Sequence, residues 1–453
     1  MPVALVYGVA ITGTAVISAL IERGYTVIAA DDNVTDEKRM VATEHGITLV
    51  EAPSAAQIHD LVINCDFVAP APAIAEHHPV VAAALSVGRP LRTELDLAYE
   101  WEQQRVGGPR PMLGVTGTDG KTTTTCMATA MLQSAGLRAA AVGNTEIPLV
   151  AMLHSDADVF VVECSSFRLH WTELFRPQAA VWLNLAPDHL NWHRNLDSYI
   201  SAKARMWRFQ RPDDIAIGFA DDPTVMRFLS AAPGRKVTFG QTNADYCTQR
   251  GYLVSPLGKL CAISSMRRSL PHDITNALAA AALVETAGLA DAAAIGHALE
   301  HFEGPPHRIE PVGQARGISW YNDSKATSPH AALTAIRAFD RLVLIAGGRN
   351  KGLDLSSLAS EPQRMQGVVA IGESGPEVAE IFAGICEVRT AATMEQAVQQ
   401  AAAMAVSGDA VVLSPGCTSF DWYAAGGYPA RGDDFRRSVL RLLRTQGNQE
   451  GQQ

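Results

Sequence analysis

The segment Gly117-Thr-Asp-Gly-Lys-Thr122 has the residue types of a phosphate-binding loop. Its two glycines let the backbone turn N–H groups toward an anion, and the helix expected after them adds the positive end of its dipole. Lys121 can reach the β- and γ-phosphates of ATP, and Thr122 can hold Mg²⁺. An ordinary glycine-rich turn is the alternative, because Val115 stands where the standard pattern has another glycine. We predict an ATP-using enzyme whose nucleotide contacts are Gly117, Thr118, Asp119, Gly120, Lys121, Thr122 and Thr123.

Three polar side chains follow predicted strands and could complete a Mg²⁺ site beside this loop. Glu163 ends the apolar run 159–163, and Asn144 and His189 follow two other apolar runs. Open α/β sheets bind ligands at the carboxyl ends of their strands, and Mg²⁺ prefers oxygen ligands. The alternatives are a capping or salt-bridged carboxylate at Glu163 and a satisfied loop histidine at His189. Lys203, within a predicted helix, reads by default as a solvated charge.

Three polar loops follow predicted strands in the last third of the chain, at 322–327, 347–351 and 414–421. The first has five polar groups in six positions, a density typical of a ligand loop, with a solvated turn as the alternative. Because parallel strands end at one edge of a sheet, the loops together predict a site for an anionic, hydrogen-bonding substrate. Arg308 follows a proline pair, and it could either reach a terminal phosphate or form a surface salt bridge.

The elements that must position these residues alternate between strand and helix along the chain. The opening reads as strand 3–7, a glycine turn, helix 15–23 and strand 26–30, which is typical of a dinucleotide-binding fold. Ala10 replaces the middle glycine of the turn, so a UDP group is at least as plausible there as NAD. The alternation predicts an α/β protein with mostly parallel sheets.

Two connectors rich in glycine and proline, 105–111 and 304–308, lie near the limits of three predicted domains, and we expect the central domain to begin a little upstream of the first connector, near Glu94. We expect a Rossmann-like domain over 1–93 and a second Rossmann-like domain over 305–453. Between them, over 94–304, we expect a P-loop ATPase-like domain with a parallel sheet.

Composition restricts the possible partners. The chain has 453 residues, of which 47% are hydrophobic and 19% charged, so a packed core is expected. A formal net charge of −10 argues against a general nucleic-acid or membrane-surface binder, because phosphate backbones attract basic faces. The seven cysteines form no C-x-x-C pair, and we find neither a secretory signal nor an apolar run of about 20 residues. We expect a cytoplasmic protein without a membrane span or a nucleic-acid partner, and take it to be a monomer.

Taken in order, these motifs resemble those of the Mur ligases of peptidoglycan synthesis. The resemblance runs from near the N-terminus to about Phe435 and rests on an ordered set of segments. The matching segments are 117–122, 163–167, 188–190, 202–203, His272 with Asn276, 307–308, 322–327, and 414–415 with 419–421.

The resemblance implies an amide ligase whose three domains hold the UDP end of an acceptor, ATP with Mg²⁺, and an incoming glutamate. The acceptor carboxylate would attack the γ-phosphate of ATP, and the glutamate amine would then attack the acyl phosphate. Within the family, segments 165–167, 323–327 and 419–421 are most similar to those of members that add D-glutamate to UDP-N-acetylmuramoyl-L-alanine.

The resemblance also implies roles for individual residues. The implied catalytic residues are Lys121, Glu163, His189 and Lys203. The implied Mg²⁺ ligands are Thr122, Glu163, His189 and Lys203, the last as a carbamylated lysine. The implied contacts to adenosine and the γ-phosphate are Asn276, Asp323 and Arg308. The implied substrate contacts are Thr12, Asp31, Asn144, Lys325, Thr327, Lys351, Ser419 and Phe420.

Several positions depart from the family pattern and leave alternatives open. Ala71 and Ala73 replace the serine and glycine of an N-terminal substrate loop, and 424–429 is longer than usual. A changed acceptor and an L-glutamate-adding variant are therefore alternatives. A folylpolyglutamate-synthase-like ligase would share the central domain without needing a nucleotide-type N-terminal domain. A non-catalytic nucleotide-binding regulator would have no need of the implied metal ligands.

Overall fold

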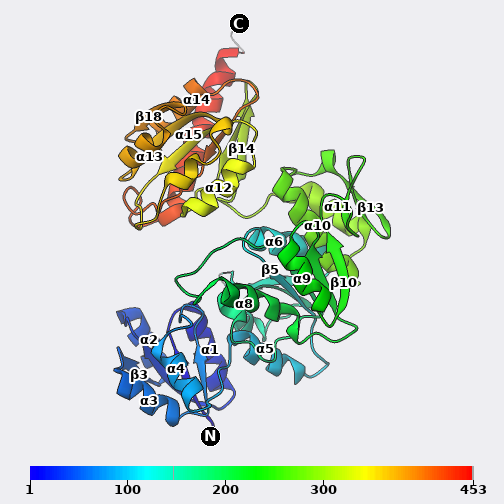
Figure 1. Cartoon of the computed structure of the whole chain (residues 1–453), viewed down its shortest axis with the longest axis vertical. Helices are drawn as coiled ribbons and strands as arrows, with labels where there is room; N and C mark the ends of the chain where they lie inside the picture. The colour runs from blue at the N-terminus through cyan, green and yellow to red at the C-terminus, as the bar shows by residue number, and fades with distance from the viewer. Residues whose placement is uncertain (146, 451–453) are drawn as a thin grey trace. The chain divides into compact units, whose positions relative to one another are not determined.

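The computed structural model describes residues 1–145 and 147–450, with side chains to residue 445 (Figure 1). The chain divides into two compact units, 1–302 and 303–453. The first unit contains two separate parallel sheets, and the second unit contains another large sheet. The predicted α/β architecture with N-terminal, central and C-terminal domains is therefore confirmed. The limits 93/94 and 304/305 stay predictions, and residues 451–453 lie outside the described part of the chain.

The N-terminal domain is a parallel sheet in the order β3-β2-β1-β4. Successive residues of β1 point to opposite faces, so Ala4 and Val6 pack with α1 while Leu5 and Tyr7 pack with α3 and α4. The strands are β1 (Val3–Tyr7), β2 (Thr26–Asp31), β3 (Thr48–Glu51) and β4 (Phe67–Pro70). The helices are α1 (Ile11–Glu22), α2 (Asp36–His45), α3 (Ala55–Ile63) and α4 (Pro79–Ser86).

The central domain is a parallel sheet in the order β10-β9-β8-β5-β7-β6. Because β5 lies between β7 and β8, the connections leave it in opposite directions, and such a switch point is where open α/β sheets bind ligands. The strands are β5 (Met112–Thr116), β6 (Ala139–Gly143), β7 (Val159–Glu163), β8 (Ala179–Trp182), β9 (Ile215–Phe219) and β10 (Arg235–Phe239).

Helices cover both faces of this sheet. Apolar residues of α6 and of the alanine-rich α10 pack together on one face, and α8 contributes Met206 and Trp207 to the other (Figure 1). The helices are α5 (Glu94–Gln103), α6 (Lys121–Ser134), α7 (Ser166–Leu169), α8 (Leu196–Arg208), α9 (Pro223–Ala231), α10 (Pro271–Thr286) and α11 (Ala292–His301). A small antiparallel sheet follows β10 and consists of β11 (Cys247–Gln249), β12 (Tyr252–Ser255) and β13 (Gly258–Ala262).

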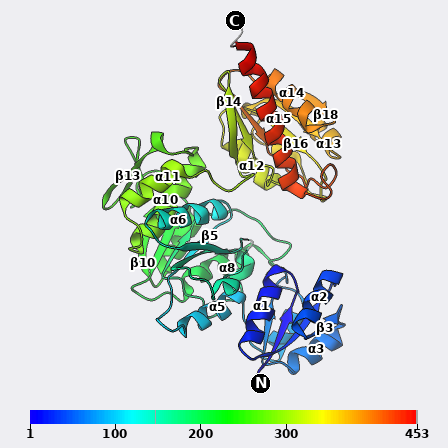
Figure 2. The same cartoon turned by 180° about the vertical axis from the view of Figure 1, so that it is seen from behind.

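The C-terminal unit has the strand order β14-β15-β19-β16-β17-β18, in which β14 and β15 are antiparallel and the other pairs parallel. Helices α14 and α15 lie side by side over one face (Figure 1, Figure 2). The strands are β14 (Glu310–Ala315), β15 (Ile318–Asn322), β16 (Leu342–Gly347), β17 (Met365–Ile371), β18 (Glu387–Ala391) and β19 (Ala410–Leu413). The helices are α12 (Pro329–Arg337), α13 (Gly375–Phe382), α14 (Met394–Met404) and α15 (Gly427–Glu450).

Among the described helices, we find none that combines the length and the apolar character needed to cross a membrane.

Candidate active site

The phosphate loop joins β5 to α6 and is shaped by its two glycines. Gly117 has a φ of 157°, and Gly120, the N-cap residue of α6, has a φ of 81°. A Cβ on Gly120 would lie 2.4 Å from Oδ1 of the buried Asn276, so a larger residue would displace its neighbour. Nζ of Lys121 donates to the carbonyl oxygens of Gly117 (3.0 Å) and Thr118 (2.7 Å). The ammonium group is therefore held against the loop, where phosphate oxygens could replace these acceptors.

Asn184, shortly after β8, braces the same loop and was missed by the sequence analysis. Its Oδ1 accepts hydrogen bonds from the N–H groups of Thr118 (3.0 Å) and Asp119 (2.9 Å), and its Nδ2 donates to the carbonyl of Asp119 (3.2 Å). The sequence offered one signal, an asparagine at the end of an apolar run. The missing information was that β8 lies next to β5.

Glu163 ends β7 at the same edge of the sheet, in register with Val115 and Gly143. The residue is 1% exposed, and its Oε1 accepts a hydrogen bond from Nδ2 of Asn144 (3.0 Å). Within the described residues, Oε2 has no hydrogen-bond partner and the carboxylate forms no salt bridge. An unpaired buried carboxylate oxygen is costly unless a cation meets it. The site therefore fits a bound metal better than the capping or salt-bridge alternatives.

Lys203 points from α8 toward the phosphate loop, so the alternative of a solvated helical charge is wrong. The residue is 1% exposed, and Nζ donates to the carbonyl of Gly117 (2.6 Å). The Tyr199 ring centroid lies 4.6 Å from Nζ, and the Tyr199 hydroxyl is 2.9 Å from Oγ1 of Thr118. Burial, assisted by the charge of Lys121, holds the pKa of Lys203 well below its usual value. A desolvated lysine of this kind can act as a neutral amine nucleophile.

His189 lies in the loop after β8 and has a φ of 55°. Its ring centroid is 4.6 Å from that of Phe167 and 6.3 Å from that of Tyr199. Its Nε2 lies 3.3 Å from a carboxylate oxygen of Asp188. Thr122, the second residue of α6, is half-buried beside the loop. Residues from β7, α6, α8 and the loop after β8 are thus arranged around the phosphate loop.

The residues predicted to contact adenosine and the γ-phosphate belong to different units. Asn276 lies on α10, and its Oδ1 accepts from Oγ1 of Thr124 (3.2 Å), next to the buried Thr123. Asp323 is buried in the C-terminal unit. Its Oδ1 accepts a hydrogen bond from the backbone N–H of Ile309, the residue after Arg308 (3.2 Å). Their contacts with a nucleotide stay predictions.

Thr12 and Asp31, the predicted acceptor contacts, have protein partners. Oγ1 of Thr12 accepts from Arg168 at 2.9 Å, and Arg168 forms a buried ion pair with Glu94. Asp31 pairs with Lys38 at 2.8 Å and accepts two backbone N–H bonds. Burial alone would raise the pKa of Asp31, but the hydrogen bonds outweigh it and lower that pKa. Arg168 was missed, and its only signal was a basic residue in the short segment after Glu163.

The polar loops 322–327, 347–351 and 414–421 meet at one edge of the C-terminal sheet. They follow β15, β16 and β19, and β19 pairs with both other strands. Oγ of Ser414 donates to Oδ2 of Asp323 at 2.7 Å, which ties the first loop to the third. The second and third loops also exchange backbone hydrogen bonds.

Arg431 on α15 ties two of these loops together and was also missed. It is fully buried and donates to the carbonyl oxygens of Ser324 (2.8 Å) and Cys417 (3.1 Å). Burial lowers its pKa to about 10, so the side chain stays charged at neutral pH. No sequence pattern singled it out, because one of its partners, Ser324, precedes it by 107 residues.

The predicted glutamate contacts lie on these loops with different exposures. Ser419 is buried, and within the described residues its Oγ has no hydrogen-bond partner. Lys351 and Phe420 are exposed. Nζ of Lys325 lies 5.6 Å from the centroid of the Tyr428 ring. The backbone carbonyl of Lys325 accepts a hydrogen bond from the backbone N–H of Thr327 at 2.9 Å.

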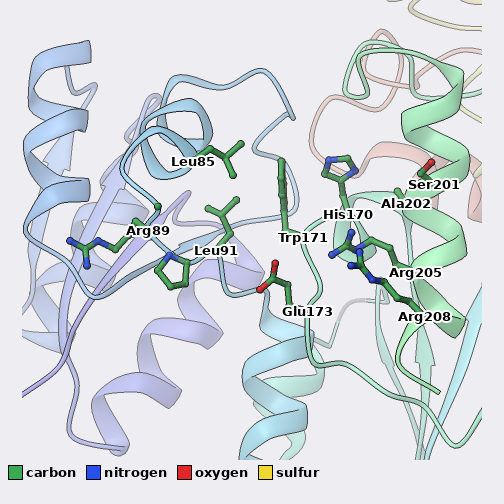
Figure 3. A pocket seen from close by; sticks show the side chains of 12 residues that line it. Leu85, Arg89, Leu91, His170, Trp171, Glu173, Ser201, Ala202, Arg205 and Arg208 are labelled. Carbon is green, nitrogen blue, oxygen red and sulfur yellow. The ribbon is translucent and has the colours of Figure 1, made fainter. Parts of the chain in front are cut away.

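A cavity of about 530 Å³ lies beside α8 and is lined in part by Ala202 and Arg205 of that helix. Leu85 and Leu91 line one wall, and Trp171, His170 and Arg205 line another (Figure 3). The predicted catalytic residues are absent from the lining that the described residues form. The predicted catalytic residues thus gather at the phosphate loop and not in this cavity.

Two long segments of the chain match known domains. Residues 115–284 match the Mur ligase middle domain, and residues 307–417 match the Mur ligase glutamate ligase domain. Together they contain the phosphate loop and most of the three polar loops.

Curated relatives match almost the whole chain. A Frankia casuarinae protein named UDP-N-acetylmuramoylalanine–D-glutamate ligase is 38% identical, over 96% of this chain and 93% of the relative. A Mycolicibacterium vanbaalenii protein of the same name is 36% identical, over 97% of this chain and 98% of the relative.

Solved structures share the fold at lower identity. UDP-N-acetylmuramate-alanine ligase from Thermotoga maritima is 20% identical with a TM-score of 0.57, over 98% of this chain and 100% of that one. MurF ligase from Thermotoga maritima in complex with ADP is 17% identical with a TM-score of 0.59, over 97% of this chain and 95% of that one. By its domains and its near full-length relatives, this chain belongs to the Mur ligase family.

Proposed function

We propose that this chain is an ATP-dependent amide ligase that adds D-glutamate to UDP-N-acetylmuramoyl-L-alanine in peptidoglycan synthesis. The observation that carries the proposal is a sequence identity of 36% and 38%, over nearly the full length of the chain, to two relatives named for that reaction. The match includes the N-terminal domain, which a folylpolyglutamate-synthase-like ligase would not need. A phosphate loop joined to a buried lysine and an unpaired buried carboxylate supports a catalyst over a non-catalytic regulator.

In the first step, an oxygen of the acceptor carboxylate attacks the γ-phosphorus of ATP. The new O–P bond forms as the bond between the γ-phosphorus and its bridging oxygen breaks, and ADP leaves. Negative charge on the transferring oxygens is met by Lys121 and by N–H groups at the start of α6. In the second step, the glutamate amine attacks the acyl carbon, loses a proton, and phosphate leaves as the C–N bond forms.

Thr122, Glu163, His189 and a modified Lys203 would hold Mg²⁺. The unpaired Oε2 of Glu163 and the half-buried Thr122 hydroxyl supply oxygen donors, which suit this ion. The ion, when bound, would neutralise phosphate charge at the phosphate loop. The unmodified ammonium of Lys203 would repel the ion, so this donor set fits Mg²⁺ best when Lys203 is neutral or anionic.

Carbamylation of Lys203 would give that donor an anionic oxygen. The neutral amine attacks the carbon of CO₂, an N–C bond forms as one C=O π bond opens and leaves its electron pair on oxygen, and the nitrogen loses a proton to solvent. The lowered pKa of Lys203 supports this reaction because it increases the neutral fraction. We expect Lys203→Ala to abolish turnover and small carboxylates to restore part of it. Near-normal activity of Lys203→Ala without added carboxylate would contradict the proposal.

The remaining assignments follow the domains. Domain 1–93 would take the UDP end of the acceptor near Thr12 and Asp31, and Asn144 would lie near its reacting carboxylate. Domain 94–304 would take ATP, and domain 305–453 would take glutamate at Lys325, Thr327, Lys351, Ser419 and Phe420. The buried Oγ of Ser419, which needs a partner, supports a polar ligand there. Adenosine would contact Asn276 and Asp323, and Arg308 the γ-phosphate. The enzyme would act as a monomer in the cytoplasm.

The decisive experiment measures phosphate release from ATP and Mg²⁺ with UDP-N-acetylmuramoyl-L-alanine, in parallel reactions with D-glutamate and L-glutamate. We expect release only when the acceptor and D-glutamate are both present. Phosphate release in the reaction with acceptor and L-glutamate, but not in the one with acceptor and D-glutamate, would retain the mechanism and change the amino-acid assignment. No release with either amino acid would refute the proposed acceptor.

A further inference from the structure

We propose that Glu76, His170 and His193 form a second metal site, distinct from the Mg²⁺ site, that binds one divalent transition ion, with Zn²⁺ as the best match. Each residue offers one ligand atom, and the three atoms lie within 4.8 Å of one another. Two imidazoles and a carboxylate are a common ligand set for Zn²⁺. We call these residues the 76/170/193 cluster.

The cluster joins two parts of the first unit. Glu76 lies between β4 and α4, His170 directly follows α7, and His193 precedes α8. Oε2 of Glu76 is 3.8 Å from Nδ1 of His193 and 3.9 Å from Nε2 of His170. Ligand atoms around a tetrahedral ion with bonds of about 2.1 Å lie roughly 3.4 Å apart. The two distances to Glu76 exceed this separation by about 0.5 Å, and a separation at the 4.8 Å limit exceeds it by about 1.4 Å, so the side chains must rotate inward around an ion.

The two histidines are in a state suited to a metal, whereas Oε2 of Glu76 accepts hydrogen bonds from Ser198 and from the Arg194 N–H that an ion would have to displace. The His193 side chain is 0% exposed, and within the described residues its Nδ1, the nitrogen that faces Glu76, has no hydrogen-bond partner. In His170, which lines the cavity beside α8, the nitrogen that faces Glu76 is Nε2. The other nitrogen of His193 lies 2.9 Å from Oγ of Ser166, an outer contact of the kind that orients metal-binding histidines. Burial is the main cause that lowers the pKa of both histidines to about 4, so both are neutral at neutral pH.

An aromatic shell surrounds the cluster and limits water. The His193 ring centroid is 4.5 Å from that of Trp192 and 5.8 Å from that of Phe167, and the His170 centroid is 4.3 Å from that of Trp171. His170 also lines the cavity beside α8, which gives an ion a path from solvent (Figure 3). A site that is dry on one side and open on the other can hold an ion with a remaining water ligand.

The 76/170/193 cluster and the proposed Mg²⁺ site have different chemistry. The Phe167 ring contacts both His189 and His193, with centroid distances of 4.6 and 5.8 Å. Mg²⁺ takes mostly oxygen ligands, whereas paired imidazoles favour Zn²⁺ and its neighbours in the first transition row. An ion at the cluster would fasten the Glu76 segment of the N-terminal domain to the central domain.

Arg194 competes with a metal for Glu76. Its Nε lies 3.2 Å from Oε1 of Glu76, and Ser198 donates to Oε2 at 2.5 Å. The Arg194 side chain is 61% exposed, so it can turn into solvent when an ion binds. Arg194→Gln removes the competing charge and should therefore tighten metal binding, which a merely structural hydrogen-bond cluster would not show.

The test is a zinc titration of the chelator-stripped full-length protein in excess Mg²⁺, against a chromophoric chelator. We expect one Zn²⁺ per chain and at least about tenfold weaker binding in Glu76→Gln and His193→Ala. Arg194→Gln should bind several-fold more tightly. His154→Ala is the matched control, because His154 is an exposed histidine that also pairs with a glutamate. His189→Ala should keep the ion, since it alters only the proposed Mg²⁺ site.

Two results would overturn the proposal. The first is that the parent protein binds no stoichiometric zinc. The polar atoms of the 76/170/193 cluster would then be hydrogen-bonded to water and not to a metal. The second is zinc that remains in both Glu76→Gln and His193→Ala. Glu76→Gln keeps the size of the side chain, so it still tests the site if His193→Ala fails to fold. Replacing Zn²⁺ with Co²⁺ checks which residues bind the ion. An absorption band from Co²⁺–thiolate bonds would show that cysteines bind the ion, and not the 76/170/193 cluster.

Discussion

Asn184→Ala tests whether the phosphate loop depends on the side chain that braces it. The substitution removes two bonds accepted from N–H groups and one donated to a carbonyl, all on Thr118 and Asp119. Gly117 directly precedes these residues, and a glycine has more backbone freedom than any other residue. Without the brace, ATP binding must supply the free energy that orders the loop.

The size of the effect follows from the three hydrogen bonds. A net contribution of about 1 kcal/mol for each gives roughly 3 kcal/mol if all are lost. Asn184 is half-buried, so water replaces part of this loss, and we expect about 2 kcal/mol against ATP binding. At 1.4 kcal/mol for each tenfold change, ATP affinity should fall about 30-fold.

The assay is calorimetric titration of ATP with Mg²⁺ into the parent and the variant, with thermal unfolding measured in parallel. Asn64→Ala is the matched control, because Asn64 is an exposed asparagine of the N-terminal domain whose Nδ2 donates to one carbonyl at 2.8 Å. It should leave ATP affinity unchanged.

Unchanged affinity in a folded Asn184→Ala protein would refute the bracing role. Tighter binding would refute it in a different way, because it would mean that Asn184 occupies N–H groups that a phosphate needs. A fall in thermal stability alone would assign Asn184 to the fold and not to the nucleotide.

Three further predictions concern the other sites. Lys351→Ala should raise the KM for glutamate at least about tenfold and leave that for ATP unchanged, because a lost charge-assisted bond costs about 1.5–3 kcal/mol; an equal rise in both would show the glutamate site is misplaced. Glu163→Gln keeps the shape but removes the charge, so turnover should need at least about tenfold more Mg²⁺; an unchanged Mg²⁺ titration would contradict the metal role. Lys203→Met should be more stable than the parent at pH 7 in CO₂-free buffer. The pKa of Lys203 in the folded protein lies well below 10.5, its value in the unfolded chain. Between these two pKa values the unfolded parent binds one proton more than the folded parent, so the parent loses stability as the pH falls. The gap in unfolding temperature should shrink toward pH 10, and a gap independent of pH would contradict the lowered pKa.

The sequence predicted the features that depend on neighbouring residues. The glycines of the phosphate loop, the strand before it and the helix after it are local, and all are present. The placement of Glu163 at a strand end followed from the apolar run before it. The meeting of the three polar loops was predictable because parallel strands end at one edge.

Features that depend on strand order or on helix packing were out of reach. Asn184 contacts the phosphate loop only because β8 lies beside β5. The face of α8 that carries Lys203 is buried by the strands below it, whereas spacing alone favours a solvated lysine. Arg431 joins a loop that lies 107 residues earlier in the chain to the nearer loop of Cys417, so no local pattern identifies it.

The short helix α7 links one of the missed residues, Arg168, to several other parts of the first unit. It begins shortly after Glu163, and each of its first residues contacts a different part of the first unit. Ser166 contacts His193, Phe167 packs on His189, and Arg168 bonds Thr12. The buried charge of Arg168 is stable only because Glu94 pairs with it, so its position cannot relax freely. A shift of α7 would therefore move its contacts with His193, His189 and Thr12 together, through packing that no single motif encodes.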